Sequence, residues 1–156
     1  MTAVDYAMLF ARSLKDDAII GAMLQDSYGR EPYVDVGYKQ DMQEWQKITP
    51  FLTFVPNITE DDESGIKSRV WLYMGVYDKE EVENGGVLVM RAYPMLSKIA
   101  ERVRTVIARE CRAVYPTTEV SGFDVEFRQE NYPLMWAVAD ITVFEHIAVG
   151  SFGPGR

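Results

Sequence analysis

The stretch PMLSKIAERVRTVIARECRAV, from Pro94 to Val114, decides the fold of this chain. Its apolar residues recur at steps of three and four, which places them on one side of a helix. Pro94 suits the first helical turn, and Tyr115-Pro116 ends the run because the residue before a proline disfavours helix. About 21 residues at 1.5 Å each make a helix roughly 31 Å long. A helix this one-sided needs a flat apolar partner. Its apolar residues are Leu96, Ile99, Ala100, Val103, Val106, Ile107, Cys111 and Val114.

Segments with the composition of strands flank this helix and supply that partner. Thr49–Pro56 and Ser68–Tyr77 precede it, and Gly122–Glu130 and Leu134–Ile147 follow it, the last with an expected bend near Ala139-Asp140. Two hairpins separated by one crossover helix predict an α+β fold. We expect a mostly antiparallel four-stranded sheet with the long helix and an N-terminal helix packed on one face.

The N-terminal helical region, residues 3–24, has helix-spaced apolar residues with one interruption. One helix, or two helices over Val4–Leu14 and Asp16–Leu24, fit this pattern equally well. Asp16 or Asp17 would cap the second helix by accepting a backbone N–H from its first turn.

Polar segments connect the remaining elements. Tyr33–Val36 has the composition of a short strand, and Asp41–Gln46 that of a helical turn. Asn57–Lys67 contains four consecutive acidic residues and is expected to be a loop. Asp78–Gly86 is expected to be a second acidic connection, leading toward the long helix.

Length and composition limit the classes of protein. A chain of 156 residues fits a single domain, residues 1–149, with a flexible C-terminal tail at 150–156. The 24 acidic and 16 basic residues give a net charge of −8, which disfavours a surface that coats nucleic acid. One cysteine excludes an internal disulfide, and no signal peptide or long apolar span is visible. We expect a soluble intracellular protein.

The residues with catalytic or metal-binding chemistry form no recognisable motif. His146 is the only histidine and Cys111 the only cysteine, so neither has a partner that sequence can assign. Asp124, Glu126 and Asp140 are typical of metal-dependent nucleases, but the expected lysine is replaced by Arg128. We expect no enzymatic activity, no metal and no cofactor.

The strand Ser68–Tyr77 is apolar on both faces, which is unusual for a sheet covered by helices on one face. Trp71, Tyr73 and Tyr77 would form the uncovered face, and aromatic residues are enriched where subunits meet. We expect this face to contact another subunit.

The order of these segments resembles that of the tail terminator (tail completion) proteins of long-tailed phages and prophages. Ser13–Leu24 is similar to their opening helical segment, and TPFLTFVP at 49–56 to their first strand. SRVWLYMGVYD at 68–78 resembles their second strand, and YPLMWAVADITVF at 132–144 their closing strand.

This resemblance implies a small α+β subunit that forms a ring, commonly a hexamer. The ring would cap the tail tube, end its polymerisation and join the tail to the head. Implied partners are further copies of the chain, the tail tube protein and a head-completion or neck protein, with DNA passing through the lumen without specific binding. The protein would be assembled in the host cytoplasm, reside in the virion tail and contact no membrane.

In such a ring we expect the acidic residues Glu60, Asp61, Asp62 and Glu63 to lie beside the aromatic contact, facing a basic partner or the DNA channel. Their mutual repulsion would keep residues 57–67 disordered until assembly. Two alternatives stay open. One is another structural protein of the phage neck or tail tube. The other is a small acidic ligand-binding or regulatory α+β domain.

Overall fold

The structure, a computed structural model, describes residues 1–37, 42–114 and 116–146. The expected tail at 150–156 lies outside the described residues. The helices and strands are, in chain order, α1 (Ala3–Lys15), α2 (Ala18–Tyr28), β1 (Tyr33–Val36), α3 (Met42–Lys47), β2 (Phe51–Asp62), β3 (Gly65–Tyr77), β4 (Glu81–Asn84), β5 (Val87–Met90), α4 (Ala92–Val114), β6 (Thr118–Arg128) and β7 (Leu134–His146).

The main sheet has five strands in the order β1-β2-β3-β7-β6. The two expected hairpins, β2–β3 and β6–β7, pair through β3 and β7, and all these pairs are antiparallel. The expected four-stranded antiparallel sheet is wrong, because β1 adds a fifth strand parallel to β2. Parallel neighbours need a crossover connection, and the segment containing α3 provides it. The sheet is therefore mixed.

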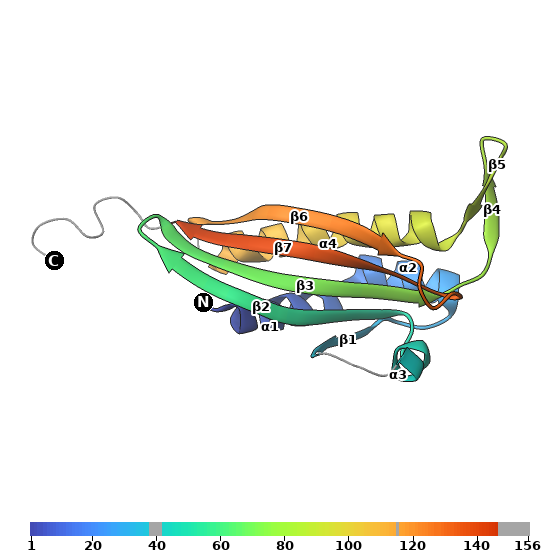
Figure 1. The fold of residues 1–156 in the computed structure, drawn as a ribbon, viewed down its shortest axis with the longest axis horizontal. Helices are drawn as coiled ribbons and strands as arrows, with labels where there is room; N and C mark the ends of the chain where they lie inside the picture. Colours follow the sequence, from blue (N-terminus) through green and yellow to red (C-terminus); the bar gives the residue numbers. More distant parts are fainter. Residues whose placement is uncertain (38–41, 115, 147–156) are drawn as a thin grey trace, which may run out of the picture.

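Helices α1, α2 and α4 lie on one face of the sheet, behind it in the view of Figure 1. The predicted apolar side of α4 is confirmed, since the residues from Leu96 to Cys111 that the spacing selects are buried. They pack with Phe10 of α1 and with buried strand residues such as Leu72 and Ile141 in one continuous core. The α+β arrangement with helices on one face is thus confirmed.

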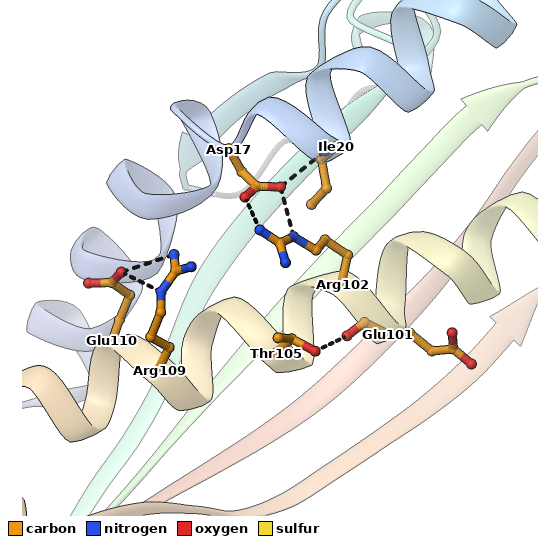
Figure 2. Close-up of polar contacts among 7 residues, drawn as sticks. All are labelled: Asp17, Ile20, Glu101, Arg102, Thr105, Arg109 and Glu110. Atoms are coloured by element: carbon orange, nitrogen blue, oxygen red, sulfur yellow. Dashed lines mark hydrogen bonds and ion pairs between the residues drawn. The ribbon is translucent and has the colours of Figure 1, made fainter.

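The N-terminal region consists of two helices, and Asp17 is the residue that caps the second. Its side chain accepts a hydrogen bond from the Ile20 backbone N–H at 3.0 Å. The same carboxylate pairs with both Nε and Nη2 of Arg102 on α4, at 3.1 and 2.7 Å (Figure 2). One residue therefore begins α2 and joins it to α4.

The two acidic connections contain paired strands rather than loops, which corrects both expectations. Residues 57–67 form the far end of the β2–β3 hairpin, with Glu60 opposite Lys67. They are ordered in the single subunit, contrary to the expected disorder. The side chain of Asp62 accepts hydrogen bonds from the backbone N–H groups of Ser64 and Gly65 at 2.7 and 3.2 Å and so closes the turn.

The second connection contains the hairpin of β4 and β5. Its two-residue turn is Gly85-Gly86, with φ of 61° and 83°, values that favour glycine. Acidic residues are depleted in strands, which is why sequence pattern indicated loops at both places.

Strand β7 pairs with β3 in unbroken register, so the bend expected near Ala139-Asp140 is absent from that pairing. The irregularity lies in the neighbouring strand instead, between Val120 and Gly122 of β6. A bulge increases the local twist of a strand. A second irregularity lies between Pro56 and Ile58 of β2, in its pairing with β3.

Candidate functional site

The face of the sheet opposite the helices carries the aromatic residues that the sequence selected. On β3 the buried residues Val70, Leu72 and Met74 alternate with Trp71 and Tyr73, which are half-buried. This alternation is confirmed. It follows from the two-residue period of a strand, which sends successive side chains to opposite faces.

Part of this face is covered by the chain itself, which the sequence did not indicate. Trp45 of α3 packs edge-on against Phe51 and Tyr73, with ring centroids 4.6 and 5.5 Å apart. Tyr73 also stacks on Trp136 at 5.9 Å. Tyr73 therefore packs mainly against a second, smaller hydrophobic core of its own chain, and not on a surface that is open to another subunit.

Beyond Tyr73 the sheet face opens into a groove of about 430 Å³, which we call the sheet-face groove. Trp71, Trp136 and Val138 form its apolar part. Charged residues complete its lining, namely Asp124, Glu126, Arg128 and Asp140.

The charges in this groove are partly neutralised within the chain. Arg69 pairs with Asp140 at 2.5 Å, and Arg128 lies 3.3 Å from a carboxylate oxygen of Glu126. Asp124 stands directly opposite Asp140 across the β6–β7 pair, and like charges at such positions repel. Tryptophan and arginine are among the residue types enriched where proteins meet, whereas aspartate and glutamate are depleted there.

The remaining residues predicted for the interface lie apart from this groove. Tyr77 is 49% exposed and borders a different depression, beside Tyr28, Arg30, Thr49 and Pro50. The structure thus brings Trp71 and Tyr73 together and separates Tyr77 from them.

The acidic group of Glu60, Asp61, Asp62 and Glu63 lies at the tip of the β2–β3 hairpin, where all four residues are exposed. Lys67, which pairs with Glu60, is four residues from Trp71, or about 13 Å along the strand. The acidic tip therefore lies farther from the aromatic residues than the sequence suggested.

The other residues with chemical interest occupy structural or surface positions. The exposed His146 side chain lies with Nε2 2.8 Å from a carboxylate oxygen of Glu119. Cys111 is fully buried, and this burial raises the pKa of its thiol to about 12, so it is not a nucleophile at neutral pH. Asp124, Glu126 and Asp140 do share the sheet-face groove, with Arg128 as the neighbouring cation.

Within residues 1–37, 42–114 and 116–146, no group of three or more histidine, cysteine, aspartate or glutamate side chains is placed to hold a metal ion. No helix of that part of the chain is both long and apolar enough to span a bilayer.

Sequence pattern identified Trp71 and Tyr73, but it missed Trp45, Trp136 and Asp140 as their neighbours. These contacts join segments far apart in the chain, and periodicity carries no information about them.

Comparison with protein-family models and with curated proteins finds no match for this chain.

Proposed function

We propose that this protein is a non-enzymatic structural subunit of a phage tail. In this proposal, copies of the chain form a ring, with the hexamer as the expected size, on the end of the tail tube. The ring ends tube polymerisation and joins the tail to a head-completion or neck protein. It functions in the virion tail after assembly in the host cytoplasm, with no cofactor.

The observation that carries this proposal is the sheet-face groove. Trp71 and Trp136 remain half-buried there because no helix of the described chain extends over them. Exposed aromatic surface bordered by charges marks sites of protein association. A ring also requires two different surfaces on each subunit, since head-to-tail contacts close into rings and two-fold contacts do not. The sheet face provides one such surface.

Sedimentation velocity at low and high concentration, with and without purified tail tubes, tests the proposal. We expect a ring-sized species that binds tube ends in negative-stain images. Trp71→Glu should reduce assembly to monomers because it places a charge in the aromatic contact. Ile19→Glu is the matched control, since Ile19 is an aliphatic residue of α2 that is 53% exposed. A wild-type protein that stays monomeric under all these conditions contradicts the proposal.

The alternative of a small acidic ligand-binding domain has one observation in its favour. The groove volume of about 430 Å³ lies within the range of small-molecule sites. A monomeric protein whose tryptophan fluorescence changes on addition of a small cationic ligand would favour this alternative, because Asp124 and Glu126 supply negative charge there.

A further inference from the structure

The hairpin Glu81–Met90, formed by β4 and β5, projects from one end of the molecule, and we call it the arm (Figure 1). It forms a two-stranded sheet of its own, separate from the main sheet. Val87 and Leu88 at its tip are 60% and 70% exposed, and Val82 is 36% exposed. An isolated two-stranded hairpin is marginally stable in water at best. The arm therefore carries apolar surface that the subunit itself does not cover.

The pairing of the arm gives it two different faces, one of valines and one on which Leu88 and Met90 lie with Glu81 and Glu83. Val82 stands opposite Val89, and Val87 opposite Asn84, so the three valine side chains point to the same side. Leu88 pairs with Glu83 and points to the other side. An exposed strand edge with apolar side chains is suited to adding a strand to another sheet.

The base of the arm is held in a fixed position by the residues before and after it. Arg91 pairs with the buried carboxylate of Asp78 at 2.8 Å, and its backbone N–H donates to the Glu80 carbonyl oxygen at 2.9 Å. The Tyr28 hydroxyl donates to Asp78 at 2.7 Å, and the Arg91 guanidinium lies over the Tyr28 ring. A projection that is already ordered loses less conformational freedom when it binds.

A groove of matching character lies between α4 and β6, and we call it the α4–β6 groove. Its volume is about 330 Å³. Strand β6 is an edge strand of the main sheet, so its outer backbone groups have no strand partner in the described chain. The residues that line the groove are Ser97, Ala100, Glu101 and Arg104 of α4 and Phe123, Val125 and Phe127 of β6.

Charge favours this groove over the sheet-face groove as the site for the arm. Arg104 lies 6.0 Å from the centre of the Phe123 ring and has no carboxylate partner among the described residues. Glu81 and Glu83 of the arm lie on its Leu88 side and form no ion pair within the described chain, so the Leu88 side is the one that matches the phenylalanines and Arg104 of this groove. The α4–β6 groove contributes one carboxylate, Glu101, beside Arg104, whereas the sheet-face groove contributes three beside Arg128 and would repel the two glutamates more strongly.

We propose that the arm of one subunit docks in the α4–β6 groove of a second copy of this chain, adding its strands to the free edge of β6. This inference rests on the proposed self-assembly and adds to the contact expected at the sheet face. Donor and acceptor surfaces are different parts of the subunit, as a head-to-tail contact requires.

A complementation experiment followed by sedimentation velocity tests this contact. The arm variant carries Val87→Glu and Leu88→Glu, and the groove variant carries Arg104→Glu. All three positions are exposed, so circular dichroism and the melting temperature should match the wild type. We expect each variant alone to self-associate at least about tenfold more weakly than the wild type. At a concentration where both are monomeric, an equal mixture should form heterodimers, because the intact arm of one fits the intact groove of the other.

Ile19→Glu again serves as the matched control and should associate like the wild type. An arm variant that assembles normally, or a mixture that stays monomeric, overturns the arm contact and leaves the proposed ring standing. A wild-type protein that assembles through the arm but does not bind tail tubes overturns the proposed function and leaves the arm contact standing. A wild type that never self-associates overturns both.

Discussion

At the scale of single residues, Asp17 does two things with one carboxylate. It caps α2 through the Ile20 N–H and pairs with Arg102 of α4, and its side chain is only 5% exposed. The sequence predicted that Asp16 or Asp17 would be the cap, because aspartate before an apolar helical segment is a local signal, and the structure selects Asp17. It did not predict the pairing with Arg102, which joins residues 85 positions apart and depends on how the helices pack.

Asp17→Asn separates these two roles. Asparagine caps helices about as well as aspartate, so the variant keeps the cap and loses the charge that faces Arg102. We expect the free energy of unfolding at pH 7 to fall by about 1.5–3 kcal/mol, the usual value for a hydrogen bond to a charged group. Urea denaturation followed by tryptophan fluorescence measures it. Asp17→Ala should cost more, because it removes the cap as well.

The pH dependence of this difference follows from the pKa of Asp17. The Arg102 hydrogen bonds lower this pKa in the folded state, aided by the Ile20 N–H and opposed by partial burial. A lowered pKa contributes stability that is complete above the unfolded value of about 3.9 and is lost as pH falls toward the folded value. The gap between wild type and Asp17→Asn should therefore be constant near neutral pH and shrink below about pH 4. A gap that widens on acidification would contradict this assignment.

At the scale of elements, α4 is the part that sequence predicted best. Its apolar spacing specified the buried side from Leu96 to Cys111, but Val114, predicted to continue that side, is 38% exposed, and the helix starts at Ala92 rather than Pro94. Strand ends were predicted less well, because Glu60 and Glu83 are exposed residues on extended backbone. The parallel pairing of β1 with β2 depends on the crossover between them and has no local signature.

Substitutions on opposite sides of α4 test its orientation. Val103 is fully buried, so Val103→Asp places an unpaired charge in the core and should cost several kcal/mol, enough to prevent folding. Arg104 is exposed, and Arg104→Asp should leave the fold intact. Circular dichroism and the soluble yield of each variant measure the outcome. Equal tolerance at the two positions would mean that the buried side of α4 is assigned wrongly.

Gly75 on β3 tests the contact between α3 and the sheet. A Cβ at this position would lie 2.3 Å from ring atoms of Phe51, which Trp45 holds in place. Gly75→Ala should destabilise the protein by about 1–3 kcal/mol, the usual cost of overpacking. Gly21→Ala is the control, because Gly21 lies in α2 with nothing within 4 Å of an added Cβ. It should raise stability by about 0.5–1 kcal/mol, since alanine favours helix. Thermal melts of both variants that show the same direction of change would contradict this packing.

At the scale of the whole molecule, the sequence predicted which face of β3 is aromatic but not how much of it stays open. The alternation of Trp71 and Tyr73 with buried neighbours is a local pattern, so it can be recognised in the sequence. The cover that Trp45 gives to Tyr73 comes from a polar segment without periodicity, and the charges that line the groove come from two strands, β6 and β7. Contacts between distant segments depend on the assembled fold, so they became visible only in the structure.

The net charge of −8 is distributed unevenly over the elongated shape. Exposed acids gather at the tip of the β2–β3 hairpin and on the arm, and Figure 1 places these at opposite ends of the molecule. The tip acids are not equivalent to one another. Asp62 closes the turn through Ser64 and Gly65, and these hydrogen bonds lower its pKa, whereas Glu60, Asp61 and Glu63 form no ion pair in the described chain.

A test of the tip must therefore keep Asp62. In the triple variant with Glu60→Lys, Asp61→Lys and Glu63→Lys, each substitution replaces a negative charge with a positive one, so the net charge changes from −8 to −2. The fold and the self-association should be unchanged, because these side chains are exposed. If the tip lines a channel for DNA, the lysines should hold phosphate by direct attraction, and this attraction weakens with salt. We expect tails that carry the variant to yield fewer infectious particles, with partial recovery at higher ionic strength.

The matched control changes the net charge equally at another site, through lysine at Asp16, Asp26 and Glu31, which are exposed residues in and around α1 and α2. It should give normal particles, because its charges lie away from the tip. Electron microscopy of joined tails and an infectivity assay compare the two variants. Equal loss in both would show that net charge alone matters, and no loss in the tip variant would remove the tip from the channel. Only a loss confined to the tip variant supports an acidic surface that keeps DNA from adhering.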